Sequence, residues 1–250
     1  MRYLGVIPAR YDSQRLPGKP LADIAGKPMV IRVYEQAIRA RSPHKIIVAT
    51  DDERIRTVCE SAGIECVLTG KSHPSGTDRI AEVMRTLYAD FDVYINIQGD
   101  MPFIPPNHID TLCGAFRNPD VSIATLITPC LDENVLRSSA SIKVVRRNDG
   151  FALYFSRSVV PFGKNPTSPR FRHIGVYAYT RNALSTIASL APSMLEISES
   201  LEQLRWLENG MSIYTLVVPE DTPSVDTPED LEYARAYAAK LTAPAFPTTP

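Results

Sequence analysis

The stretch "KIIVATDDERIRTVCESAGIECVL" (45–68) decides the fold, because it contains a complete strand–helix–strand unit. Its apolar opening, "KIIVATD" (45–51), predicts a buried strand, and "ECVL" (65–68) predicts a second one. Between them, apolar side chains recur at helical spacing through "DERIRTVCESAG" (52–63), and Gly63 is a helix stop signal. Such a unit is typical of a parallel sheet with a right-handed crossover.

The same alternation continues on both sides of this unit. Further strands are predicted at 3–7 and 93–100, and further helices at 26–41 and 75–87. The resulting β-α-β-α-β-α-β order predicts an α/β fold with a Rossmann-like, mainly parallel sheet that is flanked by helices.

The chain beyond residue 120 is richer in strand-like segments. Four of them lie close together, at 121–128, 141–147, 151–157 and 175–181. They predict an antiparallel extension of the sheet or a smaller β-rich sub-domain over its edge.

The last part of the chain returns to alternating helices and strands. A helix is predicted at 197–210, a strand at 212–218 and a terminal helix at 227–241. Thr227 is the expected N-cap of the terminal helix, and Pro228 is its expected first residue.

The composition is that of an ordinary globular protein, with 250 residues, 44% apolar residues, 22% charged residues and a net charge of −1. This near-neutral balance gives no reason to expect nucleic acid or an anionic membrane as a partner, so an anion site must be local. No apolar run approaches the about 20 residues of a transmembrane helix, and the N-terminus does not resemble a signal peptide. The four cysteines show no metal-binding spacing. We therefore expect a cytoplasmic protein with free thiols.

The loop after the first strand, "IPARYDSQRLPGKP" (7–20), concentrates positive charge. Ligands of open α/β sheets bind outside the carboxyl ends of the strands, where this loop must lie. Arg10, Arg15 and Lys19 would repel one another unless an anion lay between them, and a polyphosphate is a good candidate. Gly18 permits unusual dihedral angles beside the stiffening prolines. The loop matches neither GxGxxG nor GxxxxGK[ST], and a basic surface loop remains the alternative.

This loop, with "GKPM" (26–29) just after it, resembles the start of the sugar-acid cytidylyltransferases, and the 3-deoxy-manno-octulosonate (KDO) cytidylyltransferase family matches best. The resemblance covers roughly residues 3–240. It continues through these motifs: "ATDDERI" (49–55), "SGTDRIAEV" (75–83), "INIQGD" (95–100), "IKVV" (142–145), "ALYFSR" (152–157), "HIGVYAYTR" (173–181), "LEQLRWLENG" (201–210) and "VDTPEDLE" (225–232).

The resemblance implies a fold of the nucleotidyltransferase type, a homodimer, and the coupling of CTP to KDO with release of pyrophosphate. It also implies one domain at 1–241, followed by a disordered tail at 242–250. Residues 1–130 would form the nucleotide-binding half, 131–218 the part for the acid substrate and dimerisation, and 219–241 a returning segment that completes a metal site.

Specific residues match the functional positions of the family. The expected catalytic residues are Arg10, Arg15, Lys19, Asp100 and Asp226, of which the two aspartates would bind Mg²⁺. The expected nucleotide-binding residues are Pro8, Ala9, Arg10, Arg15, Lys19, Ser75, Gly76, Thr77, Arg79 and Gln98. The expected residues of the acid pocket are Gln98, Arg157, His173, Tyr177, Glu202 and Gln203.

Each assignment has a structural alternative. Asp226 could be an ordinary helix-start acid, and Ser75 or Thr77 could serve purely as an N-cap. His173 could be a buried structural histidine, and Glu202, with Gln203 beside it, could lie on a solvated helix face.

The sequence also departs from the family pattern. Met101 follows "QGD" where the family has an acid, "SSAS" (138–141) replaces Asn-Pro-Asn-type residues, and the Pro-rich loop at 160–170, expected to be mobile, is short. The loss of a charge at Met101 leaves open a different acceptor, such as an 8-amino-KDO-like sugar or a phosphonate. An inactive nucleotide-binding relative is a further alternative.

Overall fold

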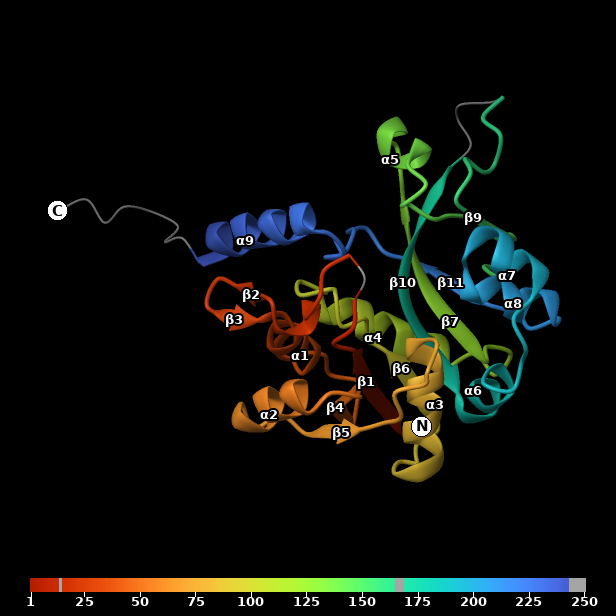
Figure 1. Ribbon diagram of the computed structural model, residues 1–250. Helices are drawn as coiled ribbons and strands as arrows, with labels where there is room; N and C mark the ends of the chain where they lie inside the picture. Colours follow the sequence, from red (N-terminus) through yellow and green to blue (C-terminus); the bar gives the residue numbers. More distant parts are fainter. Residues whose placement is uncertain (14, 165–168, 243–250) are drawn as a thin grey trace.

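The computed structural model describes residues 1–13, 15–164 and 169–242 (Figure 1). A nine-stranded mixed sheet runs through these residues, with the main order β11-β7-β10-β6-β1-β4-β5. Its strands are β1 (Tyr3–Ala9), β4 (Lys45–Thr50), β5 (Cys66–Leu68), β6 (Val93–Asn96), β7 (Ile123–Pro129), β8 (Lys143–Arg146), β9 (Ala152–Ser156), β10 (Phe171–Thr180) and β11 (Tyr214–Val217). A small separate hairpin joins β2 (Asp23–Ile24) to β3 (Lys27–Pro28).

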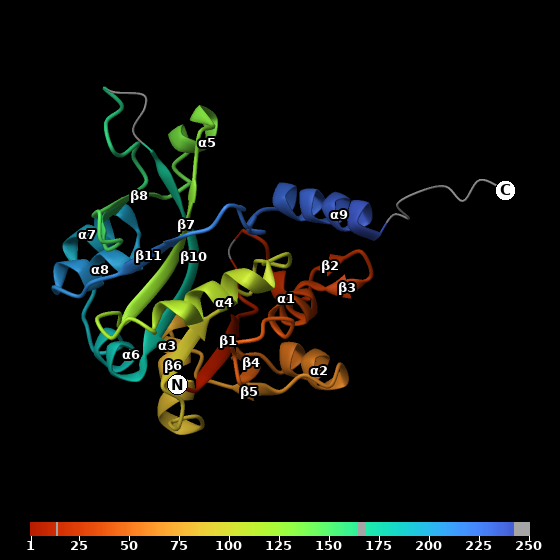
Figure 2. The same ribbon diagram turned by 180° about the vertical axis from the view of Figure 1, so that it is seen from behind.

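Helices cover both faces of the sheet (Figures 1 and 2). They are α1 (Met29–Ala37), α2 (Glu53–Ser61), α3 (Gly76–Thr86), α4 (Pro106–Ala115), α5 (Glu133–Arg137), α6 (Arg181–Ile187), α7 (Met194–Glu199), α8 (Glu202–Glu208) and α9 (Pro228–Thr242), with a 3-10 turn η1 (Lys19–Leu21). The apolar faces of α1, α2 and α4 share one core cluster. Those of α3, α6 and α8 share a second cluster on the opposite face of the sheet.

The strand–helix–strand prediction at 45–68 is confirmed as β4, α2 and β5. Asp52 caps α2, since its side chain accepts from Arg54 N, and Ile55 and Cys59 face the core. The strands β5, β4, β1 and β6 all run parallel. The parallel α/β half of the predicted fold is therefore present.

The β-rich second half continues this sheet instead of forming a separate lobe. β10 lies antiparallel between β6 and β7, and β11 pairs in parallel with β7. The hairpin of β8 and β9 extends from one end of β10. Of the two alternatives for this region, the structure shows the antiparallel extension.

The prediction of one continuous helix at 197–210 is wrong, because the chain forms α7 and α8 with a break between them. At the break Ser200 adopts a left-handed conformation with φ of 51°. The Arg157 guanidinium donates hydrogen bonds to the backbone carbonyls of Glu199 and Ser200. Arg157 directly follows β9, so these two carbonyls are satisfied by a donor from outside the helix, and α7 ends there.

The predicted terminal helix is confirmed as α9. Thr227 caps it, because its hydroxyl accepts from Asp230 N at 3.2 Å, and Pro228 is its first residue. Leu231, together with other apolar residues of this segment, packs on Ile24 and Met29. Thr242 ends this helix, while residues 243–250 of the predicted tail and 165–168 of the predicted Pro-rich loop lie outside the described residues.

Candidate active site

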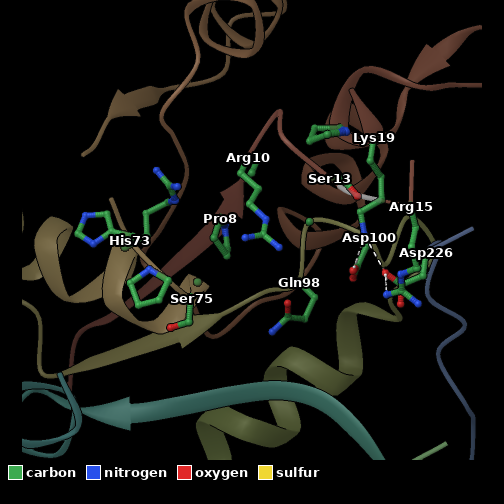
Figure 3. A pocket seen from close by; sticks show the side chains of 16 residues that line it. Pro8, Arg10, Ser13, Arg15, Lys19, His73, Ser75, Gln98, Asp100 and Asp226 are labelled. Atoms are coloured by element: carbon green, nitrogen blue, oxygen red, sulfur yellow. Dashed lines mark hydrogen bonds and ion pairs between the residues drawn. The ribbon is translucent and has the colours of Figure 1, made fainter. Parts of the chain in front are cut away.

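A cavity of about 410 Å³ opens where β1 and β6 end, on the side of their carboxyl termini (Figure 3). This is the edge of an open α/β sheet at which ligands bind. The residues that line it are Pro8, Ala9, Arg10, Ser13, Arg15, Lys19, Pro20, His73, Pro74, Ser75, Gly76, Arg79, Gln98, Gly99, Asp100 and Asp226. Four segments that are distant in sequence therefore meet at one place.

The cationic loop is held in shape by its own backbone. Gly18 has a φ of 69°, a left-handed conformation that glycine adopts without strain, and its N–H donates to Tyr11 O at 3.0 Å. The N–H of Lys19 then donates to Leu16 O, and Pro20 is buried within η1. This turn directs the Lys19 side chain back toward the end of β6.

Lys19 bridges the two predicted metal-binding aspartates. Its Nζ lies 2.9 Å from Asp100 Oδ2 and 3.0 Å from Asp226 Oδ1, and Arg15 Nη2 lies 3.0 Å from the same Asp226 oxygen (Figure 3). Burial by itself would lower the pKa of Lys19, but the charges and hydrogen bonds of Asp100 and Asp226 outweigh it, so its pKa is raised. Lys19 is therefore a fully charged ammonium group at neutral pH.

The two aspartates, 126 positions apart in the sequence, are joined by backbone contacts. Val225 N donates to Asp100 O at 2.8 Å, which places Asp226 beside Asp100. The carboxylate of Asp230 accepts from the N–H groups of both Asp226 and Thr227 at the start of α9. Asp226 thus lies at a helix start, as expected if it were an ordinary helix-start acid. Its carboxylate also faces the cavity.

Arg10 is the cation that remains available in this cavity. Its side chain points into the space between the loop and α3 (Figure 3), and among the residues that the structure describes it makes no hydrogen bond or ion pair. An exposed guanidinium without a protein partner can bind an anionic ligand without first breaking an ion pair.

Most of the predicted nucleotide-binding residues line the cavity, but Thr77 does not. Thr77 is buried, and its hydroxyl donates to Glu202 Oε2 at 3.0 Å. Ser75 caps α3, since its side chain accepts from Asp78 N, and it also lines the cavity. Arg79 is buried and donates to Asp51 Oδ2 at 2.8 Å. Ser75 is therefore both the N-cap of α3 and a residue of the cavity wall.

Five lining residues were missed by the sequence reasoning. Each of them is within two positions of a predicted residue, and that adjacency is the signal that could have found them. They are Ser13, Pro20, His73, Pro74 and Gly99.

A sequence model described as cytidylyltransferase matches residues 4–213 of the chain. The chain belongs to the cytidylyltransferase family. A relative named 3-deoxy-manno-octulosonate cytidylyltransferase from Parabacteroides distasonis is 45% identical over 250 residues, which cover 96% of this chain and 99% of the relative. One of the same name from Chloroherpeton thalassium is 45% identical over 245 residues, with 96% and 99% covered.

Solved structures agree with this cytidylyltransferase in fold. A CMP:2-keto-3-deoxy-manno-octonic acid synthetase complexed with CTP is 42% identical and superimposes with a TM-score of 0.92, over 96% of this chain and all of the other. A 4-diphosphocytidyl-2C-methyl-D-erythritol synthase from Anaerococcus prevotii has a TM-score of 0.65 at 12% identity, with 95% of this chain and 96% of the other covered, and shares the fold alone.

Of the residues predicted for the acid pocket, only Gln98 lines the cavity of this cytidylyltransferase. Glu202 contacts one of the lining residues, since its Oε1 accepts a hydrogen bond from Ser75 Oγ at 3.0 Å. Burial raises the pKa of Glu202 more than the hydroxyl groups of Thr77 and Ser75 lower it. Glu202 therefore contacts the start of α3 instead of lying on a solvated helix face.

The other four predicted residues of the acid pocket make contacts within the protein. Arg157 donates to backbone carbonyls of the α7–α8 break, as described above, and to Ser139 O. His173 is buried with its Nε2 2.9 Å from Thr125 Oγ1, and burial and the Arg172 charge lower its pKa to about 3. Tyr177 and Gln203 are also buried.

Met101 does not line the cavity of the cytidylyltransferase. Its side chain is 6% exposed and belongs to the apolar cluster under α1, α2 and α4. The departure from the family pattern therefore places an apolar side chain in the core. The backbone carbonyls of "SSAS" (138–141) accept from Lys143 and Arg157, contacts that do not depend on the side chains of these serines.

Two carboxylates are available to hold a metal ion in this site. Mg²⁺ prefers oxygen ligands and is commonly bound by one or two carboxylates together with the phosphates of a substrate. Asp100 and Asp226 supply that donor set, with oxygens close enough to share one ammonium group. Within the described ranges no group of three or more His, Cys, Asp or Glu residues could hold a metal by itself. The residues therefore fit a magnesium ion that is completed by phosphate oxygens.

No helix in the described part of the cytidylyltransferase is long and apolar enough to span a bilayer.

Proposed function

We propose that the protein couples CTP to KDO and forms CMP-KDO and pyrophosphate. The observation that carries this proposal is the full-length similarity, at 42–46% identity, to relatives named for that reaction. The buried position of Met101 supports KDO over another acid, because the missing charge does not reach the cavity.

The reaction is an in-line attack of the anomeric hydroxyl of KDO on the α-phosphorus of CTP. The bond from this phosphorus to the bridging oxygen of the β-phosphate breaks, and the hydroxyl proton passes to water. Catalysis of this kind consists mainly of positioning and charge neutralisation. Arg10, Arg15 and Lys19 are the cations that would bind the β- and γ-phosphates and neutralise the leaving pyrophosphate.

The base and the acceptor would approach from the other walls of the cavity. Pro8 and Ala9 at the end of β1, and Ser75 at the start of α3, provide backbone and hydroxyl groups for the cytosine. Gln98 Nε2 donates to Gly175 O at 2.8 Å, which leaves the side-chain oxygen to accept from a sugar hydroxyl. Gln203 Nε2 has no hydrogen-bond partner among the described residues, which supports its proposed contact with the acid.

Asp100 and Asp226 are the residues that would hold Mg²⁺. When bound, the ion supplies neutralisation of phosphate charge and polarises the phosphoryl oxygens.

The test is pyrophosphate release with CTP, measured against KDO, an 8-amino-KDO-like sugar and a phosphonate, with and without EDTA. We expect turnover with KDO that EDTA abolishes. Turnover with another acid but none with KDO would contradict the proposed acceptor. No turnover with any acid would favour an inactive nucleotide-binding relative, and EDTA-resistant turnover would contradict the metal.

We also propose a homodimer that acts in the cytoplasm and supplies lipopolysaccharide synthesis. Large apolar side chains in the 131–218 part are exposed and would be covered by a second copy. They are Leu131, Leu153, Phe162, Met194, Leu195, Ile197 and Val217. Light scattering at micromolar concentration should give the mass of a dimer, and a monomer would contradict the proposal.

A further inference from the structure

We propose that Lys19 is a built-in counter-cation, which occupies the space between Asp100 and Asp226 until CTP draws it away. The metal site then becomes complete only when the nucleotide is present. This inference rests on the proposed function, because it takes the two aspartates as the metal ligands.

Lys19 occupies the position between the two carboxylates. The Lys19 Nζ makes one short contact to each aspartate, at 2.9 Å and 3.0 Å (Figure 3). A cation that is coordinated by both carboxylates must also lie between them, and two cations cannot share this position. The Lys19 side chain is only 15% exposed, so the ammonium is held in the site and does not extend into solvent.

The charges around the two aspartates balance one another. Lys19 and Arg15 bring two positive charges to the two negative charges of Asp100 and Asp226, and these four groups are in direct contact. The cluster is therefore neutral, and a free divalent ion gains no net attraction to it. It would also have to displace an ammonium that already makes two charge-assisted hydrogen bonds.

Both cations that pair with the aspartates belong to the cationic loop. Lys19 and Arg15 follow β1 and line the same cavity as Arg10. A triphosphate in this cavity carries more negative charge than Asp100 and Asp226 together, so it would attract all three cations, including the two that are paired with these aspartates. The movement of Lys19 toward the phosphates would free Asp100 Oδ2, and the movement of Lys19 and Arg15 together would free Asp226 Oδ1, at the moment when phosphate oxygens arrive.

Binding of Mn²⁺ without nucleotide, followed by electron paramagnetic resonance, tests this inference. Mn²⁺ has the ligand preferences of Mg²⁺ and is spectroscopically visible. The variants are Lys19→Gln, which removes the charge, and Lys19→Arg, which retains it. Lys27→Gln is the matched control, because Lys27 also pairs with a carboxylate, that of Glu35, but outside the cavity.

We expect weak binding of Mn²⁺ to the wild type and at least roughly thirtyfold tighter binding to Lys19→Gln, because even an ammonium displaced to about 4 Å from a divalent ion in water repels it by that factor. Lys19→Arg and Lys27→Gln should bind like the wild type. Adding Asp226→Asn to Lys19→Gln should remove the gain.

The outcomes separate the two proposals. Equal Mn²⁺ affinity for the wild type and Lys19→Gln, lost with Asp226→Asn, would leave the metal site standing and overturn the role of Lys19. Absence of protein-bound Mn²⁺ in every variant, even with CTP, would overturn the metal ligands as well. If Lys19→Gln does not fold, tight nucleotide-free binding of Mn²⁺ by the wild type or by Lys19→Arg overturns the inference, and weak binding by both supports it.

Discussion

Gly99 packs directly against the end of β1, and this contact sets the position of Asp100. A Cβ atom at Gly99 would lie 2.6 Å from the backbone oxygen of Pro8. Cβ atoms essentially never come within 3.0 Å of such an atom, so the contact must open to at least 3.0 Å in Gly99→Ala. The opening separates Asp100 from the cationic loop that follows β1.

The magnitude follows from this displacement. A misplacement of 1 Å costs about a hundredfold in rate, so an opening of about half an ångström predicts a roughly tenfold loss of kcat in Gly99→Ala. Overpacking of this kind lowers the free energy of unfolding by about 1–3 kcal/mol. Both quantities are measurable, kcat by pyrophosphate release and stability by urea denaturation.

Gly114→Ala is the matched control. Gly114 lies in α4, and a Cβ atom there would meet nothing within 4 Å. We expect unchanged kcat and a free energy of unfolding that is higher by about 0.5–1 kcal/mol. Wild-type kcat in Gly99→Ala would refute the idea that the approach of Gly99 to Pro8 positions Asp100.

Three further substitutions test the site and its surroundings. Asp100→Asn should lower kcat by roughly a thousandfold because the charge is lost while the shape is kept, and a near-wild-type rate in excess Mg²⁺ would argue against the metal assignment. Glu202→Gln should raise KM for CTP by roughly fivefold, because an acceptor for Ser75 and Thr77 is weakened; a change in KM for the acid alone would count against that coupling. His173 has a folded pKa of about 3 against 6.5 when unfolded, so its contribution to stability is complete above pH 6.5 and is lost as the pH falls toward about 3. His173→Gln should therefore flatten the pH dependence of the urea midpoint in that window, and an unchanged slope would contradict the linkage.

The sequence was sufficient for features that depend on local pattern. Apolar periodicity predicted β4 and α2 because each of them buries apolar side chains in the core, and it predicted β5, in which Cys66 and Val67 are half-buried against the same cores. Capping chemistry predicted the start of α9 at Pro228, since a Thr N-cap and acids in the first turn satisfy the free N–H groups. The positive φ of Gly18 likewise follows from a turn that only glycine enters without strain.

Periodicity failed where a distant side chain competes with the local pattern. Leu201, Leu204 and Leu207 are spaced as in one continuous helix, but Arg157 from the end of β9 binds the carbonyls at the break before Leu201. Such a contact has no signature in the helical segment itself. The short helices α5 and α6 and the helix α4 were also not predicted.

The sequence by itself determined the α/β class and the cationic loop after β1, because these depend on residue type and on spacing over a few positions. The tertiary structure alone decided that Asp226 lies beside Asp100, that Lys19 bridges them, and that Met101 is buried in the core. The first two facts depend on hydrogen bonds and ion pairs between residues 81 to 207 positions apart, and the third depends on packing in the core. Local sequence patterns carry no information about such contacts.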